Sequence, residues 1–244
     1  MDLAAAAAAL SSGLCLDAPP VALAFRDTAP AGVATAEAPE PSSCSFWRRG
    51  EAGPIFADAQ AHMHCAVGAM VMGFELSEGV QQELMAAAEM MNGCGYLTAD
   101  EVPDIPTIKS ARGGILYGPL ADFPGDPDLV LVWLTPLDAM LFAEAAGTCS
   151  WAQASTSTRG LLGRPACAAL PIALNTGAAT LSLGCAGMRT FTEISGDRLL
   201  GAVPGAQLEA FVDALARTLH ANAQMQQYYD GRKADVATLR KSSF

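Results

Sequence analysis

Cysteines set among small residues are the side chains of this sequence best suited to chemistry. Cys167 and Cys185 lie in residues 163–189, GRPACAALPIALNTGAATLSLGCAGMR. Gly184 and Gly187 flank Cys185, and glycine lets a backbone approach a bound group closely. Because the thiolate is the form of cysteine that binds metals, this stretch indicates two sulfurs presented to a metal ion or a cluster.

A second group of candidate ligands lies earlier in the chain. Cys44 stands in a loop rich in Pro, Ala, Ser and Gly, just before the aromatic residues Phe46 and Trp47. The segment AHMHCAVGA then supplies His62, His64 and Cys65. Side chains at i and i+2 point to opposite faces of a strand and lie well apart on a helix, so at most one histidine could reach a shared metal. We expect both histidines beside the centre or at the surface.

The cysteines recur in a similar order in two halves of the chain. The apolar segment VALAF is followed by Cys44, by Cys65 with glycines behind it, and by a helix pattern. The apolar segment LVLVWL is followed by a helix pattern, Cys167, Cys185 among glycines, and another helix pattern. Two halves related by a pseudo-two-fold axis would bring these cysteines to one interface. Four cysteines are the ligand set of a 4Fe-4S cluster or a closed zinc site.

Composition limits the partners. The 244 residues carry 25 acidic and 14 basic side chains, a net charge of -11, and binding to nucleic acid or anionic membranes requires clustered Lys and Arg. We therefore expect no nucleic acid and no membrane as partners, and a small molecule or a redox protein instead. No basic residue precedes Arg26, so a secretory signal is not predicted, and the seven cysteines suit a cytoplasmic protein with reduced thiols.

Hydrophobic periodicity and capping signals position these residues on a mixed α/β fold. We expect an Ala-rich N-terminal helix, helices at residues 77–91, 136–146 and 204–229, and strands at 21–25, 114–117, 129–134, 189–194 and 198–203. Met85, Met90 and Met91 are expected to pack in the core. The expected organisation is a single compact domain over residues 1–244, with half-repeats at roughly 14–112 and 113–229 and a polar tail at 230–244.

Several motifs in sequence order resemble one known family, the bacterial and archaeal domain of unknown function 169. They are DAPPVALAF, CSFW, HMHCAVGA, YLTADEVPDIP, ILYGPLADFP, GRPACAALP, SLGCAGMRTF and the pair Ala221-Asn222. The resemblance covers roughly residues 10–232, and its cysteine pattern coincides with Cys44, Cys65, Cys167 and Cys185. The family pattern leads us to expect proline where Ala66 stands and a small residue where Arg49 stands.

A 4Fe-4S cluster held by the four cysteines is the leading hypothesis. Thiolate-only ligation, glycine turns that offer N–H groups to sulfur, and long spacings between the ligands all favour it, whereas zinc ribbons usually carry CxxC pairs. Four apolar residues are expected to shield the cluster: Phe46, Trp47, Met70 and Met72. Such a centre suits a redox or small-molecule-binding role.

Two other kinds of site stay open, and so does a structural interpretation. A zinc or other mononuclear centre would use His62 or His64 in place of a cysteine. A metal-free enzyme would use Cys167 as its nucleophile, with the thiolate favoured by Arg164 and a helix start. Arg164 and Arg189 would hold an anionic substrate or the charge of a cluster, or would simply pair with acidic residues while the cysteines fill small gaps.

Overall fold

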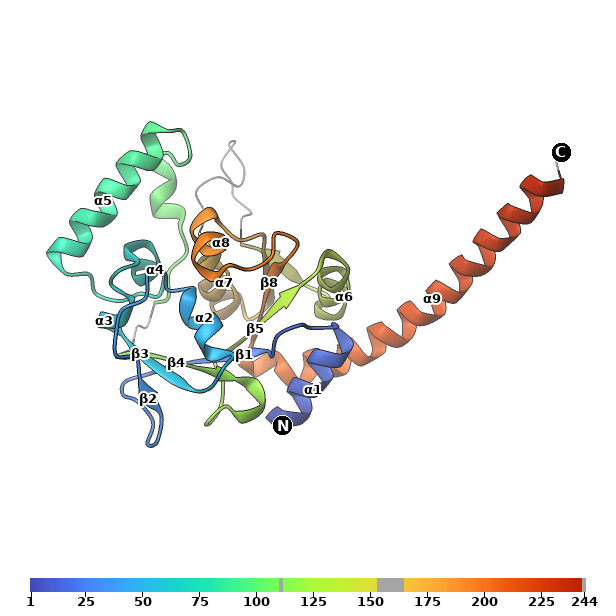
Figure 1. Cartoon of the computed structure of the whole chain (residues 1–244), viewed down its shortest axis with the longest axis horizontal. Helices are drawn as coiled ribbons and strands as arrows, with labels where there is room; N and C mark the ends of the chain where they lie inside the picture. Colours follow the sequence, from blue (N-terminus) through green and yellow to red (C-terminus); the bar gives the residue numbers. More distant parts are fainter. Residues whose placement is uncertain (110–111, 153–164, 243–244) are drawn as a thin grey trace.

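The two most apolar segments of the chain form the strands at the middle of one mixed sheet (Figure 1). The computed structural model describes residues 1–109, 112–152 and 165–242. The strands are β1 (Val21–Arg26), β2 (Ala34–Thr35), β3 (Ile55–Asp58), β4 (Gly114–Pro119), β5 (Leu129–Leu134), β6 (Cys149–Trp151), β7 (Ala179–Ser182) and β8 (Leu199–Pro204). Their order is β2-β3-β4-β1-β5-β8-β7-β6, which confirms the expected α/β class.

Helices cover both faces of this sheet. The α-helices are α1 (Leu3–Gly13), α2 (Ser45–Gly50), α3 (Ala59–His62), α4 (Ala66–Val71), α5 (Glu78–Gly93), α6 (Pro136–Ala146), α7 (Ala169–Thr176), α8 (Ala186–Thr192) and α9 (Leu208–Ser242). Short 3-10 helices are η1 (Ala99–Asp104), η2 (Leu120–Asp122), η3 (Ala166–Ala168) and η4 (Gly205–Gln207). The described chain forms a single compact domain around one sheet.

Alternating side chains of the central strands divide the buried residues between two cores. Along β1, Leu23 packs into the core with α2, α4, α7 and α8, while Ala22 and Ala24 pack into the core with α1, α6 and α9. This is the period-two alternation of a strand that is buried on both faces. The cysteines Cys44 and Cys167 belong to the first core, so the candidate site lies on one face of the sheet.

The strand order has the form that a two-fold relation requires. When β1 to β4 are matched in order with β5 to β8, the order of strands is the same from either end of the sheet. The pairs β2/β3 and β6/β7 are both parallel, and the β1/β5 register is symmetric about the pair of Ala22 with Val130. The two-fold axis stays a prediction. This matching divides the halves between β4 and β5, later than the expected division at residue 113.

Several expected elements are confirmed. The N-terminal helix, the helix that Ser77 caps and the helix that Thr135 and Pro136 begin are present as α1, α5 and α6. The strands expected at 21–25, 114–117, 129–134 and 198–203 correspond to β1, β4, β5 and β8. Within the Pro-, Ala-, Ser- and Gly-rich loop expected around Cys44, β2 and α2 were missed, because two and six residues are too few for a periodic pattern.

The strand expected at residues 189–194 is wrong, because most of this segment lies in helix α8. The chain turns after β7 at Gly184, which has a φ of 86°, a value that favours glycine. The sulfur of Cys185 then accepts a hydrogen bond from the N–H of Met188, which begins a helix. β8 pairs with β5 and β7 instead.

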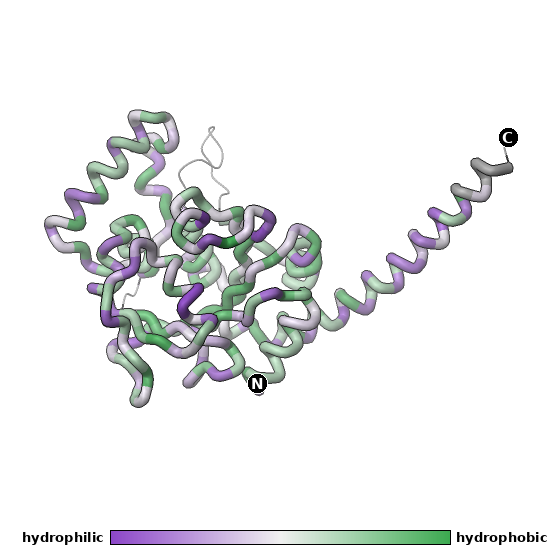
Figure 2. Tube along the Cα trace, viewed as in Figure 1, coloured by the Kyte–Doolittle hydropathy of each residue, from purple (hydrophilic) through white to green (hydrophobic). Residues whose placement is uncertain are grey.

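The expected end of the last helix at residue 229 is wrong, since residues 230–242 of the polar tail continue α9. No proline interrupts the segment, and it contains Ala, Lys, Arg and Leu, which favour helix. Figures 1 and 2 show the outer part of α9 extending away from the body, with many hydrophilic residues. Among the described residues, no helix combines the length and apolar character needed to cross a membrane.

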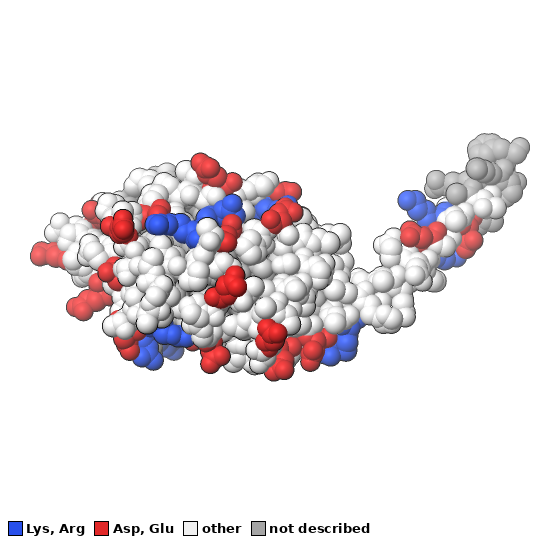
Figure 3. All heavy atoms as spheres, turned by 60° about the horizontal axis from the view of Figure 1, so that its bottom comes forward, with Lys and Arg blue, Asp and Glu red and all other residues white. Residues whose placement is uncertain are grey.

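The methionines of α5 do not pack in the core, contrary to expectation. Met85 and Met90 are 61% and 63% exposed, and no residue of α5 is buried. The helix packs mainly against α4 and η1 at the side of the molecule, so its apolar face has no sheet to cover. Figure 3 shows acidic side chains spread over one face of the body, with basic side chains among them.

We predict that only the inner part of α9 stabilises the fold. Phe211 is 5% exposed and its ring lies 4.9 Å from that of Phe142, so Phe211→Ala should lower the free energy of unfolding by about 3–5 kcal/mol. Tyr229 is 57% exposed, and Tyr229→Ala should change it by less than about 0.5 kcal/mol. Chemical denaturation measures both. An equal loss of stability in the two variants would contradict the claim that only the inner part of α9 stabilises the fold.

Candidate metal centre

The four cysteines selected by the sequence line one cavity of about 480 Å³. Each lies where a helix begins: Cys44 before α2, Cys65 before α4, Cys167 in η3 before α7, and Cys185 before α8. The helices start on the face of the sheet that carries the first core. Segments far apart in the sequence therefore bring their sulfurs to a common space.

Burial differs among these four thiols. Cys44 and Cys167 are 4% and 3% exposed, while Cys65 and Cys185 are half-buried. A hydrogen bond with the Cys44 thiol, burial and the nearby sulfurs of Cys65 and Cys185 raise the pKa of Cys167 well above its usual value. Cys44, Cys65 and Cys185 therefore lie close enough to Cys167 to influence its pKa.

Cys185 has a raised pKa for a similar reason. Burial disfavours its thiolate, although the N–H groups of Ala166 and Met188 oppose this by donating to the sulfur. Reactive nucleophilic cysteines have a lowered pKa, so the environment of Cys167 is the opposite of what the metal-free enzyme hypothesis requires. Arg164, the cation invoked for that hypothesis, lies outside the described residues. A bound metal, in contrast, displaces the thiol protons directly.

The other three cysteines have different positions. Cys94 lines the rim of the cavity and is exposed. Cys15 is exposed on the chain after α1, and Cys149 lies in the edge strand β6 beside the second core. The described structure therefore separates Cys15 and Cys149 from the four central cysteines.

His62 is held entirely by the fold. Its Nδ1 lies 2.8 Å from the carbonyl oxygen of Asp58, and its Nε2 lies 3.0 Å from the hydroxyl of Tyr117. A carbonyl can only accept, so Nδ1 carries the proton and Nε2 accepts from Tyr117. Burial lowers the pKa of His62 to about 4, which keeps the ring neutral. Both ring nitrogens are engaged, and the exposed His64 does not line the cavity either.

Trp47 and its neighbours lie behind the cysteines. Trp47 and Phe46 are fully buried, with the Trp47 ring 6.1 Å from that of Trp133. Met72 is also fully buried, so of the four residues expected to shield a cluster only Met70 lines the cavity. The others form the core beneath it.

Three buried polar groups near Cys44 have no hydrogen-bond partner among the described residues. They are the indole N–H of Trp47 and the hydroxyls of Ser43 and Ser45. An unsatisfied buried donor costs free energy, and metal-bound sulfur is an acceptor that N–H and O–H groups commonly approach. These donors are consistent with a sulfur-rich group bound nearby.

Gly68 of α4 lies very close to the side chains of Ser43 and Cys65. A Cβ atom at Gly68 would lie 2.4 Å from Ser43 Oγ and 2.8 Å from Cys65 Sγ, far inside van der Waals contact. The motif HMHCAVGA contains this glycine, but neither Gly68 nor Ser43 was identified as part of the site, because α4 and the segment before α2 come together only in the fold.

We predict that Gly68→Ala will displace Cys65 and Ser43 and lower the free energy of unfolding by about 1–3 kcal/mol, with loss of any metal bound at the cysteines. Gly187→Ala is the matched control, since Gly187 also lines the cavity but a Cβ there would meet nothing within 4 Å. Denaturation and metal content of both variants check this. An unchanged Gly68→Ala protein would contradict the close approach.

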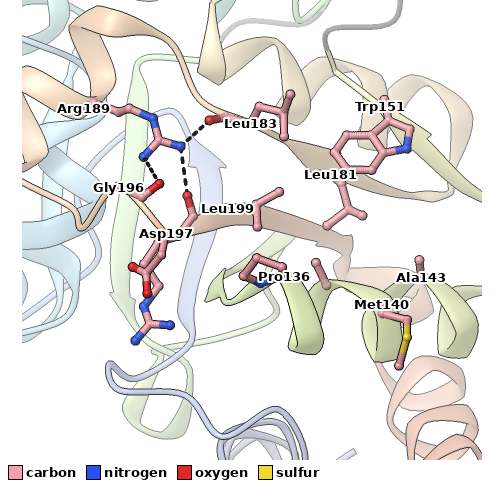
Figure 4. A pocket seen from close by; sticks show the side chains of 12 residues that line it. Pro136, Met140, Ala143, Trp151, Leu181, Leu183, Arg189, Gly196, Asp197 and Leu199 are labelled. Carbon is pink, nitrogen blue, oxygen red and sulfur yellow. Dashed lines mark hydrogen bonds between the residues drawn. The ribbon is translucent and has the colours of Figure 1, made fainter.

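Arg189 is engaged with backbone oxygens. Its guanidinium donates to the carbonyls of Leu183, Ser195, Gly196 and Arg198, and Figure 4 shows it turned toward this loop beside a shallow pocket. It therefore ties the segment before Cys185 to the turn before β8, and its position does not supply a free cation to the cysteine cavity. Arg49, where a small residue was expected, forms an ion pair with Glu40 at 2.8 Å.

We predict that Arg189→Leu will lower the free energy of unfolding by about 2–3 kcal/mol, because charge-assisted hydrogen bonds to several carbonyls are lost. Thermal denaturation checks the stability. Arg189→Lys should be less severe, since one ammonium group still reaches some of these oxygens. A variant with unchanged stability but weakened anion binding would restore the expectation that Arg189 holds a ligand.

No set of three or more His, Cys, Asp or Glu side chains among the described residues is arranged to hold a metal ion. A tetrahedral zinc ion with Zn–S bonds of about 2.3 Å requires sulfurs about 4 Å apart, whereas a four-iron cluster holds its cysteine sulfurs roughly 7 Å apart. The cysteines surround a shared space without forming a compact four-sulfur site.

Comparison with known proteins places the chain in a family. Residues 9–214 match the family model DUF169, described as "Uncharacterised ArCR, COG2043". The chain belongs to this family, which confirms the resemblance found in its motifs. No curated protein and no solved structure matches the chain.

Proposed function

We propose that the protein binds a 4Fe-4S cluster through Cys44, Cys65, Cys167 and Cys185 and acts in redox chemistry or small-molecule binding at that centre. The observation that carries the proposal is the convergence of these four cysteines, from four separate segments, on one cavity. Their mutual influence on the pKa of Cys167 supports it. The same four cysteines are selected by the similar order of strands, cysteines and helices in the two halves of the sequence.

A cluster fits the surroundings better than a single zinc ion. The histidine alternative loses support because both nitrogens of His62 are engaged and His64 faces solvent. Thiolate-only ligation by four cysteines from widely spaced segments is typical of a cluster, whereas structural zinc sites usually use closely spaced CxxC pairs. The buried donors of Ser43, Ser45 and Trp47 lack partners, as expected where sulfur atoms of a bound group would accept their hydrogens.

The roles of the protein residues follow from their positions. Such a cluster, when bound, supplies electron transfer at a potential set by its surroundings. Cys44 and Cys167 would anchor the buried side, and Cys65 and Cys185 the side nearer solvent. The N–H of Met188 already donates to Cys185 at 3.4 Å and would stabilise its thiolate. Phe46, Trp47 and Met72 exclude water from behind.

The experiment is anaerobic purification followed by spectroscopy and metal analysis. We predict a brown protein with a broad absorption near about 400 nm and about four iron and four acid-labile sulfide per chain. Ser at Cys44, Cys65, Cys167 or Cys185 should deplete iron and bleach the band, because each substitution removes one ligand. Cys15→Ser, Cys94→Ser and Cys149→Ser should leave both unchanged, and Cys15 and Cys149 are the stricter controls because they lie away from the cavity.

Two outcomes would contradict the cluster. A colourless protein with one zinc per chain would favour the mononuclear alternative, and a protein that binds no metal after reconstitution with iron and sulfide would leave both without support. Iron lost from only three of the four serine variants would indicate a cluster with one open iron, which favours substrate binding over simple electron transfer.

A further inference from the structure

The cavity above the four cysteines is larger than the centre itself requires. Its volume of about 480 Å³ falls within the range of about 300–1,000 Å³ typical of small-molecule sites. A cluster of eight atoms would fill only part of it, since even one water takes roughly 30 Å³ in the liquid. The remaining space lies between the cysteines and helix α5.

The wall of this space is apolar. Its described lining includes Leu84, Ala88 and Met91 of α5, with Val102, Ile105 and Phe191 from neighbouring segments. No Lys, Arg, Asp, Glu or His among the described residues lines the cavity. A charged molecule would therefore lose its hydration without gaining a counter-ion, which is costly, so the lining selects an uncharged ligand.

Tyr96 gives the cavity one directed polar group. Tyr96 lines the cavity beside Cys185 and Ala186. Burial raises its pKa and the nearby Cys185 sulfur adds to this, while the backbone N–H of Ala186 opposes it. A neutral phenol hydroxyl can donate its hydrogen to a ligand. Apart from the cysteines, the only other polar side chain that the described lining contains is Ser42. A ligand with one acceptor oxygen would match Tyr96.

Helix α5 has the properties of a cavity wall rather than of a core helix. Leu84, Ala88 and Met91 recur at helical spacing on the side that lines the cavity, yet no residue of α5 is buried. Thioethers such as that of Met91 adapt readily to a bound surface. Glycines with positive φ, Gly73 at 78° and Gly95 at 75°, stand in the connections on either side of the helix.

We infer that this cavity binds an uncharged, mainly apolar molecule carrying a carbonyl-type acceptor, with the acceptor at Tyr96 and the apolar body against α5, beside the four cysteines. The inference rests on the proposed function and extends it by naming the class of molecule that binds beside the cysteines. Ligand binding and iron content are measured separately, so the binding inference and the cluster proposal can fail independently.

The test is calorimetric titration of anaerobically purified full-length protein, with iron measured in the same sample. The probe is 2-acetylnaphthalene, which is uncharged, apolar and carries one carbonyl. We expect saturable binding of this probe and at least tenfold weaker binding of 2-naphthoate, which has the same rings but a carboxylate. The electron paramagnetic resonance spectrum of the reduced centre should change when the probe binds, because the ligand lies beside the cysteines.

Two variants of α5 locate the site. Ala88→Trp fills the cavity and should weaken probe binding more than tenfold. Ala86→Trp is the matched control, because Ala86 is exposed on the outer side of the same helix with Gln82 and Glu89, and should leave binding unchanged. Equal effects of the two substitutions would overturn the location, and circular dichroism confirms that both variants fold.

Tyr96→Phe tests the polar contact. It should weaken binding of 2-acetylnaphthalene about fivefold, as expected for one hydrogen bond, and leave binding of 2-ethylnaphthalene unchanged. Loss of both probes would contradict the role of the hydroxyl. Absence of probe binding in iron-loaded protein, or equal binding of 2-naphthoate, would overturn the inference while the cluster stands. Probe binding without iron or sulfide after reconstitution would sustain the cavity and reject the cluster.

Discussion

The antiparallel pairing of β1 with β5 is the constraint on which the rest of the structure depends. These strands are buried on both faces and lie at the middle of the sheet, so each must carry side chains for two cores. From this pair outward, the same strand order extends in both directions. The segments that follow β2 and β3 therefore reach the same face as those that follow β6 and β7, and the four cysteines meet there.

Close packing of backbone around this meeting point limits which residues the site accepts. Gly68 brings α4 against Ser43, and Gly184 turns the chain into Cys185. Arg189 holds the following loop through backbone oxygens, and His62 fixes Tyr117 beneath Cys44 and Cys167. Arg189 and His62 thus stabilise the fold around the cysteines, and sulfur is the main chemical function among the side chains that line the cavity.

The two halves differ in the connection that lines the cavity beside the cysteines. β7 and β8 are joined by α8 and a short turn, whereas the connection from β3 to β4 also contains α5 and η1. This longer connection supplies Tyr96 and the apolar wall of the cavity. The halves resemble each other in strand order and in the positions of the cysteines, and they differ in the connection that lines the rest of the cavity.

The sequence by itself determined the family, the central strands, the helices α1, α5 and α6 and the inner part of α9, because apolar periodicity and caps are local signals. It also selected four cysteines that line one cavity. It missed the short helices α2, α3, α4, α7 and α8 and the strands β2, β3, β6 and β7. It also misassigned residues 189–194, ended the last helix too early and placed the α5 methionines in the core. Only the tertiary structure decided these points. Short edge strands depend on their partners, α5 found no sheet to cover, and the roles of Arg189, Gly68 and Tyr96 arise from contacts between segments that sequence spacing does not relate.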